Sequence, residues 1–285
     1  MESIPQLLTR RWHPALTWQA AVARHPALRY AQIVPIGLLL WGLDDSASFR
    51  AGAAPAGLRD ALAVNSISLR LGGAFAHVMN DWLTSHHVAA LAAAWYYIIL
   101  QGALTGIIGV AMIWRRMPGL ALHRDALIAV TAIGLATFWF YPVAPPRMLP
   151  GYHDVIASAM PTFAHVIEAK GADQFASLPS LHVAWALWGA IVCTVLLRRR
   201  PVLRLAVWLY PVATVADVLA TANHYLLDVI TAPVILLLGY AAAGIPLLVR
   251  HLAAGRQAGR HPAHPATATA TAGPAQRPQA GARSS

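Results

Sequence analysis

Charged residues are scarce in this chain. Asp, Glu, Lys and Arg make up 11% of its 285 residues, and hydrophobic residues make up 58%. A soluble domain contains roughly 25% charged residues, so the composition excludes an ordinary soluble globular protein. It predicts an all-α integral membrane bundle instead.

Acidic residues are rarer than basic ones: 11 Asp and Glu stand against 21 Lys and Arg, which gives a formal net charge of +10. In a nucleic-acid-binding protein such an excess would gather on one soluble face. Here the basic residues fall mostly in short gaps between apolar runs, a pattern typical of membrane topology signals. We therefore expect a bilayer and no nucleic acid as partner, with anionic lipid headgroups as a secondary contact.

Cysteine is nearly absent. The single Cys193 lies within an apolar run, so it offers no intrachain disulfide and is better interpreted as a packing residue than as a nucleophile. The first thirty or so positions carry arginines but no apolar stretch ahead of a small-residue cleavage site, and we expect no cleavable signal peptide. The histidines show no metal-ligand spacing, so neither a metal nor a cofactor is expected.

Long apolar runs are what the chain does contain. A membrane-spanning helix needs about 20 mostly apolar residues, and prolines inside such runs should kink rather than break the helices. We predict a basic cytoplasmic segment (1–26), a six-span membrane catalytic domain (27–249) and a disordered cytoplasmic tail (250–285). The expected spans are 27–43, 88–114, 126–144, 182–197, 202–222 and 225–249.

The connections between these spans alternate in charge. The N-terminal segment, the second-to-third loop, the fourth-to-fifth loop and the C-terminal segment are rich in arginine, whereas the other two long connections mix acidic and basic residues. Basic connections stay in the cytoplasm, so both termini are predicted to lie on the cytoplasmic side of the plasma membrane. In the first outer connection, leucines between 58 and 69 with charged neighbours predict a helix that lies at the membrane interface.

Three polar segments lie at the predicted outer ends of different spans: Pro145-Pro146-Arg147, Pro179-Ser180-Leu181-His182, and the segment from His224 to Asp228. His224 and Asp228 are four positions apart, so on a helix they share one face. A carboxylate that holds one imidazole nitrogen leaves the other free to attack phosphorus. The alternative is two polar residues at a helix start, one of which is a cap.

The other two segments supply what a phosphate needs. Ser180 is a suitable N-cap, and the free N–H groups of the following turn form an anion site beside His182, which can protonate a leaving alkoxide. Arg147, held by two prolines, can clamp two phosphate oxygens. The alternatives are a plain cap with an interfacial histidine, and a snorkelling arginine.

Together, Phe-Tyr-Pro-Val-Ala-Pro-Pro-Arg at 140–147, Leu-Pro-Ser-Leu-His at 178–182 and Thr-Ala-Asn-His-Tyr-Leu-Leu-Asp at 221–228 resemble the type 2 phosphatidic acid phosphatase superfamily. The sequences of these three motifs are most similar to its inositol-phosphorylceramide-synthase-like branch of membrane phosphotransferases. The resemblance implies that His224 is the nucleophile, Asp228 its orienting partner and His182 the general acid. It also implies that Arg147 binds phosphate with help from Ser180, and it implies no metal.

The chain departs from the family pattern in its cations. A lysine usually stands where this sequence has Phe140, and Ser-Arg usually stands where it has Asp217 and Val218. Arg147 must therefore carry more of the charge stabilisation, or Lys170 or Arg70 must contribute from an outer loop. A histidine that often follows the paired tyrosines of the second span has no counterpart here, where Gln101 follows Tyr96-Tyr97.

Asp217, Asp154 and Asn223 are further candidates for substrate contacts. If the helix continued, Asp217, Thr221 and His224 would share one face, and Asp217 would reach a donor hydroxyl or pair with a cation. The equal alternative is a neutral carboxyl that is hydrogen-bonded inside the bundle.

The sequence thus predicts a membrane phosphotransferase acting on a lipid phosphate or phospholipid donor, with a site that faces the extracytoplasmic side. If the acceptor is water, the enzyme is a lipid phosphatase; if it is a lipid or sugar hydroxyl, it is a transferase. The rival from another class is a non-enzymatic anion carrier with a His/Asp proton relay. Carriers of that kind often show inverted repeats, and none is apparent in the sequence.

Overall fold

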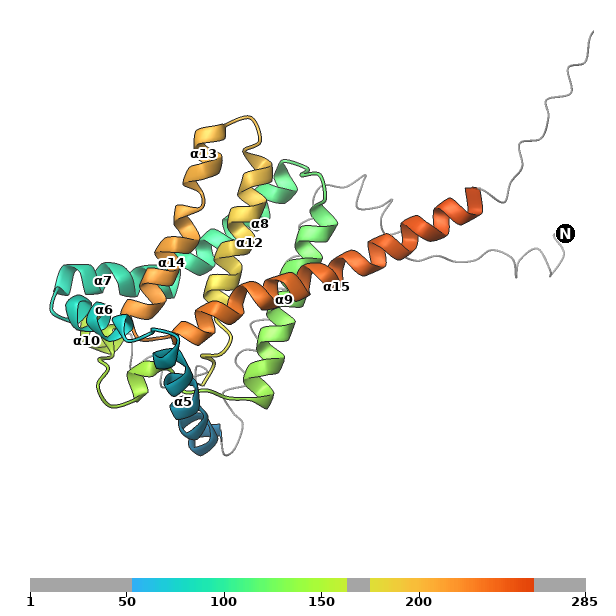
Figure 1. The fold of residues 1–285 in the computed structure, drawn as a ribbon. Coiled ribbons are helices and arrows are strands. Elements are labelled where there is room, and N and C mark those ends of the chain that lie inside the picture. Colours follow the sequence, from blue (N-terminus) through green and yellow to red (C-terminus); the bar gives the residue numbers. More distant parts are fainter. Residues whose placement is uncertain (1–52, 163–174, 259–285) are drawn as a thin grey trace, which may run out of the picture. The chain divides into compact units, whose positions relative to one another are not determined.

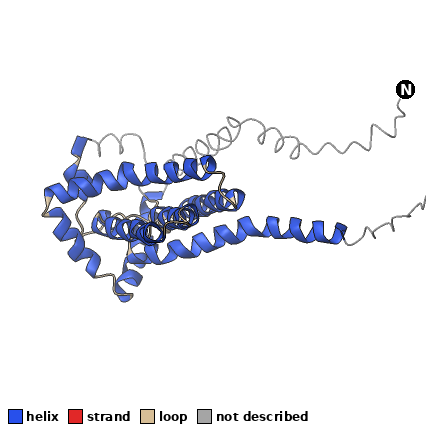
Figure 2. Ribbon diagram, turned by 90° about the horizontal axis from the view of Figure 1, so that it is seen from above, coloured by secondary structure: helices blue, strands red, loops and turns tan. Residues whose placement is uncertain are grey.

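The computed structural model describes residues 53–162 and 175–258. The expected first span, Lys170 and the end of the predicted tail lie outside the described residues. Within them the secondary structure is helical without strands, and the only extended pairing there is an isolated bridge between Val143 and Ala176 (Figure 2).

Apolar helices, joined by short connections, make up the described chain (Figure 1). Two short helical turns, η1 and η2, interrupt or follow the longer helices. In chain order the elements are α5 (Ala53–Arg70), α6 (Phe75–Thr84), α7 (His87–Trp95), η1 (Tyr96–Leu100), α8 (Gln101–Trp114), α9 (Leu120–Phe140), η2 (Pro146–Met148), α10 (Val155–Ala159), α12 (Leu181–Leu196), α13 (Pro201–Ala206), α14 (Leu209–Ala220) and α15 (Leu226–Ala258).

Within residues 53–162 and 175–258, four helical stretches are long and apolar enough to cross a membrane, which indicates a membrane protein. The helix α12 is apolar but has only 16 residues, and the expected span at 27–43 is not described, so the predicted six spans are not confirmed. The four stretches are His87–Trp114, Leu120–Phe140, Pro201–Ala220 and Leu226–Pro246.

Prolines account for two differences from the predicted boundaries. The helix α9 ends at Phe140 rather than at residue 144, because Pro142 and the Pro145-Pro146 pair cannot continue a helix. The fifth stretch is divided at residues 207–208, since Pro211 has no N–H to donate to the carbonyl of Val207. Residues 141–145 therefore form a non-helical connection after α9, and this connection leads to Arg147 in η2.

The helix α12 lies at the centre of the bundle and contacts α8, α9 and α14 (Figure 1). Small residues permit the close approach: a Cβ on Gly134 of α9 would lie 2.5 Å from Leu181 Cδ2, and one on Gly189 would lie 2.9 Å from Ile108 Cδ1. Trp188 is fully buried and donates from Nε1 to the carbonyl of His123 at 2.8 Å. These contacts hold α12 against α8 and α9.

The first described helix, α5, forms where a helix was expected around residues 58–69, while its place at the membrane interface stays a prediction. The side chains of its leucines are exposed, with Leu62 61% exposed, whereas Ala61, Val64 and Ser68 are buried. At the other end of the chain, α15 continues to Ala258, inside the segment predicted as a disordered tail. Leu248 and the residues after it belong to a separate compact unit.

Candidate active site

Main-chain hydrogen bonds bring the three motif segments together. The N–H of Arg147 donates to the carbonyl of Ala222 at 2.9 Å, and the N–H of Ser180 donates to the carbonyl of Asp228 at 3.2 Å. Ala222 has a φ of 54°, a left-handed conformation that a non-glycine residue adopts at a cost of about 1–2 kcal/mol. This turn ends α14 and redirects the chain, so His224 leaves the helix and faces the Arg147 segment.

The two nitrogens of His224 have different surroundings. Nδ1 lies 2.8 Å from the carbonyl oxygen of Ser177. Because a carbonyl only accepts, Nδ1 carries the proton and donates it, and Nε2 holds a lone pair. Nε2 is buried and has no hydrogen-bond partner among the described residues, and the ring lines a cavity. An imidazole in this state is a ready nucleophile.

Asp228 supports His224 without being its only partner. Asp228 Oδ2 accepts from Ser177 Oγ at 2.6 Å and from the N–H of Tyr225 at 2.8 Å, and it lies 3.4 Å from His224 Nδ1. The predicted shared helix face is wrong, because α15 begins at Leu226 and His224 lies before it. The two side chains meet instead because Asp228 reaches back over the first turn to the N-cap, as in a capping box.

Tyr225 joins this turn to the proline segment. Its hydroxyl donates to the carbonyl of Ala144 at 2.9 Å. Burial, and secondly the neighbouring Asp228 carboxylate, raise the pKa of Tyr225, so the phenol stays a neutral donor at physiological pH. The bond therefore holds the connection after α9 against the start of α15 under all working conditions.

His182 is the second residue of α12, and Ser180 caps that helix by accepting from the N–H of Val183 at 3.3 Å. The His182 ring stacks on Tyr97 with centroids 4.3 Å apart. Its centroid lies 5.7 Å from that of His224. The main-chain carbonyl of His182 accepts a hydrogen bond from Gln101 Nε2. The α7–η1–α8 stretch thus fixes both the ring and the backbone of this histidine.

Arg147 is held from two sides. One terminal nitrogen donates to Asn223 Oδ1, and Nε lies 3.3 Å from Asp154 Oδ2. Asn223 is itself fixed, because its Nδ2 donates to Thr221 Oγ1 at 2.9 Å. A guanidinium has five N–H donors, so several stay available for phosphate oxygens.

A cavity of about 230 Å³ connects these groups. Arg147 is the only side chain among the described lining residues that is cationic at every working pH. Among the residues that the structure describes, no group of three His, Cys, Asp or Glu could hold a metal ion. The cavity brings together an imidazole with an unpartnered Nε2, a guanidinium and a second imidazole. It is lined by Tyr97, Phe138, Pro145, Arg147, Ala176, Ser177, Leu181, His182, Trp185, Asn223 and His224.

Three residues considered for the site, Asp154, Arg70 and Asp217, do not line the cavity. Asp154 pairs with Arg147 and caps α10 by accepting from the N–H of Ala157 at 2.8 Å. Arg70 ends α5 and does not line the cavity. Asp217 does not line it either: α14 ends at Ala220, so the helix that would have put Asp217 and His224 on one face stops before His224.

Three residues that the sequence did not single out complete the site. Ser177 supplies the carbonyl on His224 and the hydroxyl on Asp228, Tyr97 stacks on His182, and Gln101 holds the His182 backbone. Tyr97 and Gln101 lie in the segment after the paired tyrosines, which stood out in the sequence only because a histidine common in the family branch is missing there. Ser177 stands one residue before the Leu-Pro-Ser segment, and its residue type gave no sign that its main-chain carbonyl would contact His224.

The family model of the PAP2 superfamily matches residues 62–242, which is more than half of the chain and includes every residue that lines the cavity. The chain belongs to the PAP2 superfamily. This confirms the resemblance to the type 2 phosphatidic acid phosphatases, and it indicates an enzyme with phosphatase or phosphotransferase activity on phosphate esters. No curated protein and no solved structure matches the chain.

Proposed function

We propose that this PAP2 protein transfers the phosphoryl group of a lipid-linked phosphate through a phosphohistidine on His224. The observation that carries the proposal is the state of the ring: Nδ1 faces a pure acceptor, while Nε2 is unpartnered and borders the cavity that holds Arg147. A histidine kept only for packing would be expected to use both nitrogens, since a buried unpaired nitrogen costs about 1–3 kcal/mol.

In the first step the Nε2 lone pair of His224 forms a bond to phosphorus while the bond from phosphorus to the leaving oxygen breaks. His182, as imidazolium, gives its proton to that oxygen, and an alcohol departs. Arg147 donates to the non-bridging oxygens, where charge is concentrated in the transition state. The ring of His224 becomes cationic, and Asp228 at 3.4 Å from Nδ1 stabilises it.

The second step reverses the first with another nucleophile. His182, now neutral, accepts the proton of an acceptor hydroxyl as the acceptor oxygen bonds to phosphorus. The bond from phosphorus to Nε2 breaks, and the neutral His224 returns. Water as acceptor gives inorganic phosphate, whereas a lipid or sugar hydroxyl gives a new phosphoester.

The choice of acceptor follows the sequence resemblance. The inositol-phosphorylceramide-synthase-like motifs favour an inositolphosphotransferase-like transfer, with hydrolysis as the alternative. The basic connections that follow α8 and α12 join the ends of these helices opposite to the site. We therefore propose that the site faces the extracytoplasmic side of the plasma membrane.

Covalent trapping tests the nucleophile. The purified full-length protein is mixed with phosphorus-labelled lipid monoesters and diesters, quenched rapidly and assayed for an alkali-stable, acid-labile label. We expect label in the wild type and none in His224→Ala, while His87→Ala, which alters an exposed histidine at the start of α7, labels normally. Label that persists in His224→Ala contradicts the assignment.

Product analysis and topology complete the test. With an alcohol acceptor present, headgroup exchange without phosphate release supports transfer, and phosphate release from a monoester supports hydrolysis. For orientation, Met148→Cys in a Cys193→Ser background is labelled with an impermeant maleimide in intact cells. Labelling is expected, since Met148 is 36% exposed beside Arg147, and its absence contradicts an outward site.

A further inference from the structure

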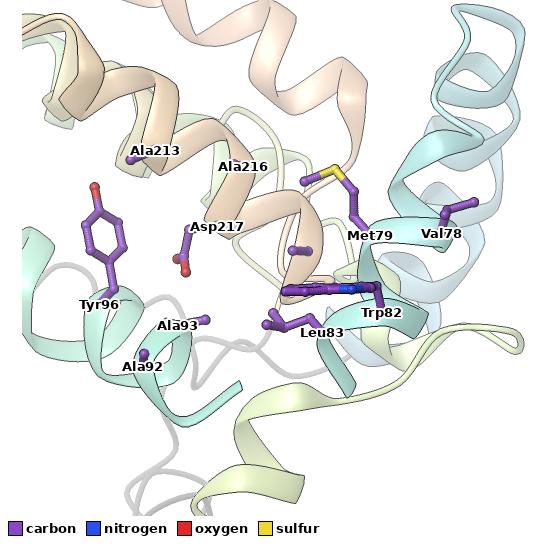
Figure 3. A pocket seen from close by; sticks show the side chains of 11 residues that line it. Val78, Met79, Trp82, Leu83, Ala92, Ala93, Tyr96, Ala213, Ala216 and Asp217 are labelled. Carbon is purple, nitrogen blue, oxygen red and sulfur yellow. The ribbon is translucent and has the colours of Figure 1, made fainter. Parts of the chain in front are cut away.

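A second and larger cavity, of about 630 Å³, lies between α6, the α7–η1 stretch and α14 (Figure 3). It shares no lining residue with the active-site cavity. Its size falls in the range of small-molecule sites, about 300–1,000 Å³. The lining is almost entirely apolar: Val78, Met79, Trp82, Leu83, Ala92, Ala93, Tyr96, Ala213, Ala216, Asp217 and Ala220.

Asp217 is the exception in this lining. Figure 3 shows its side chain directed from α14 into the space in front of Ala93 and Tyr96. Asp217 Oδ2 is buried and has no hydrogen-bond partner among the described residues. The hydroxyl of Tyr96, which also lines this cavity, is already hydrogen-bonded to Thr214 Oγ1 at 2.7 Å. A carboxyl placed this way in a membrane span is costly, which makes it a candidate for function.

The cavity is open to its surroundings. Val78 and Trp82, two of the lining residues, are 69% and 56% exposed, and the neighbouring Val212 of α14 is 64% exposed. In a membrane protein such an unpartnered apolar face is covered by lipid chains. A lipid that enters here meets apolar walls along its chain and a single unpaired carboxyl.

We propose that this cavity is a second lipid site, which binds a long-chain lipid alcohol whose hydroxyl donates a hydrogen bond to Asp217. A phosphate group does not fit, because the lining contains no cation to pair with it. A primary ammonium group does not fit either, since it brings three donors to a wall that offers one unpaired acceptor. A hydroxyl brings one donor, and its chain packs against Met79, Trp82 and Leu83.

The proposal stands apart from the proposed reaction, because it concerns binding in a cavity that contains none of the reacting groups. The test uses full-length protein in nanodiscs and three probes with the same diazirine-bearing C16 chain: the primary alcohol, its methyl ether and the primary amine. After irradiation the labelled peptides are mapped. We expect the alcohol to label segments 78–96 and 213–220 about tenfold more than the ether, which accepts but cannot donate.

Variants assign the preference to Asp217. We expect Asp217→Leu to remove the preference for the alcohol over the ether, and Ala216→Trp to abolish labelling by filling the cavity. Val212→Trp, an equally large change on the same helix outside the lining, is the matched control and should label as the wild type does. His224→Ala should also label normally, which separates this site from the active site.

Three results overturn the proposal: equal labelling by alcohol and ether in the wild type, the strongest labelling by the amine, or an unchanged preference in Asp217→Leu. If Asp217→Leu does not fold, the comparison of the three probes on the wild type decides alone. Folding of each variant is checked by gel filtration in detergent before the nanodiscs are made.

Discussion

Replacing Asp228 by asparagine separates charge from geometry in the active site. Asp228 Oδ2 accepts from Ser177 Oγ and from the N–H of Tyr225, and an amide oxygen can accept both bonds. Oδ1 is buried without a partner among the described residues, so an amide nitrogen there exchanges one unpaired group for another. The carbonyl of Ser177 still holds the proton of His224 on Nδ1. The free energy of unfolding should therefore change by about 1 kcal/mol or less.

Catalysis should suffer much more. In the proposed reaction Nε2 of His224 attacks phosphorus, and the ring then becomes cationic with Nδ1 3.4 Å from Asp228 Oδ2. Unit charges about 4 Å apart attract by about 1 kcal/mol in water and about 4 kcal/mol near a protein surface. Since each 1.36 kcal/mol is a factor of ten, Asp228→Asn should lower kcat by about 5- to 1,000-fold. Asp228→Ala should lower both kcat and stability, because it leaves the Tyr225 N–H unpaired at about 1–3 kcal/mol and leaves Ser177 Oγ only the longer bond to the carbonyl of Asn223 at 3.3 Å.

The assay is product formation from a labelled lipid phosphate, paired with thermal unfolding of the same preparations in detergent. Thr231→Val is the control: its hydroxyl bonds only to main-chain carbonyls of α15, so both readouts should stay near the wild type. Activity of Asp228→Asn within twofold of the wild type would refute the electrostatic role. An equal loss of thermal stability in the Asn and Ala variants would show that the effect is structural.

Two further predictions address the cation and the packing. Asp154→Asn keeps the cap of α10 but removes the carboxylate 3.3 Å from Arg147 Nε, so inhibition by inorganic phosphate should strengthen about two- to fivefold; unchanged inhibition constants would argue against a phosphate role for Arg147. Gly134→Val puts a side chain where even a Cβ lies 2.5 Å from Leu181, so the variant should lose about 1–3 kcal/mol of stability. The control is Gly102→Ala, whose Cβ has no neighbour within 4 Å; equal melting temperatures for the two would contradict the predicted crowding.

The sequence predicted an all-helical chain with long apolar helices, because these features follow from the length of the apolar runs. Spans need about 20 apolar residues, and the helices His87–Trp114 and Leu226–Pro246 lie where such runs occur. The proximity of Arg147, His182 and His224 followed from the alternation of basic connections. These are properties of long stretches, which a single local contact rarely overrides.

Local geometry was less predictable. The spacing of His224 and Asp228 indicated a shared helix face, yet the left-handed Ala222 ends one helix and α15 begins only at Leu226. Asp217 was expected near His224 for the same reason and lies in a different cavity. The backbone turn that decides both outcomes depends on tertiary contacts such as the Arg147 N–H on the Ala222 carbonyl, which no spacing rule contains.

The carbonyl of Ser177 has a consequence for how such an enzyme should be dissected. It fixes the proton of His224, and every amino acid placed at position 177 brings the same carbonyl. Substitution of that side chain removes a hydroxyl from Asp228 and leaves the contact to the imidazole untouched. A complete alanine scan would thus assign no role to the carbonyl that holds the proton on Nδ1 of His224. Moving or weakening this oxygen requires a change in the main chain, such as an ester bond between residues 177 and 178.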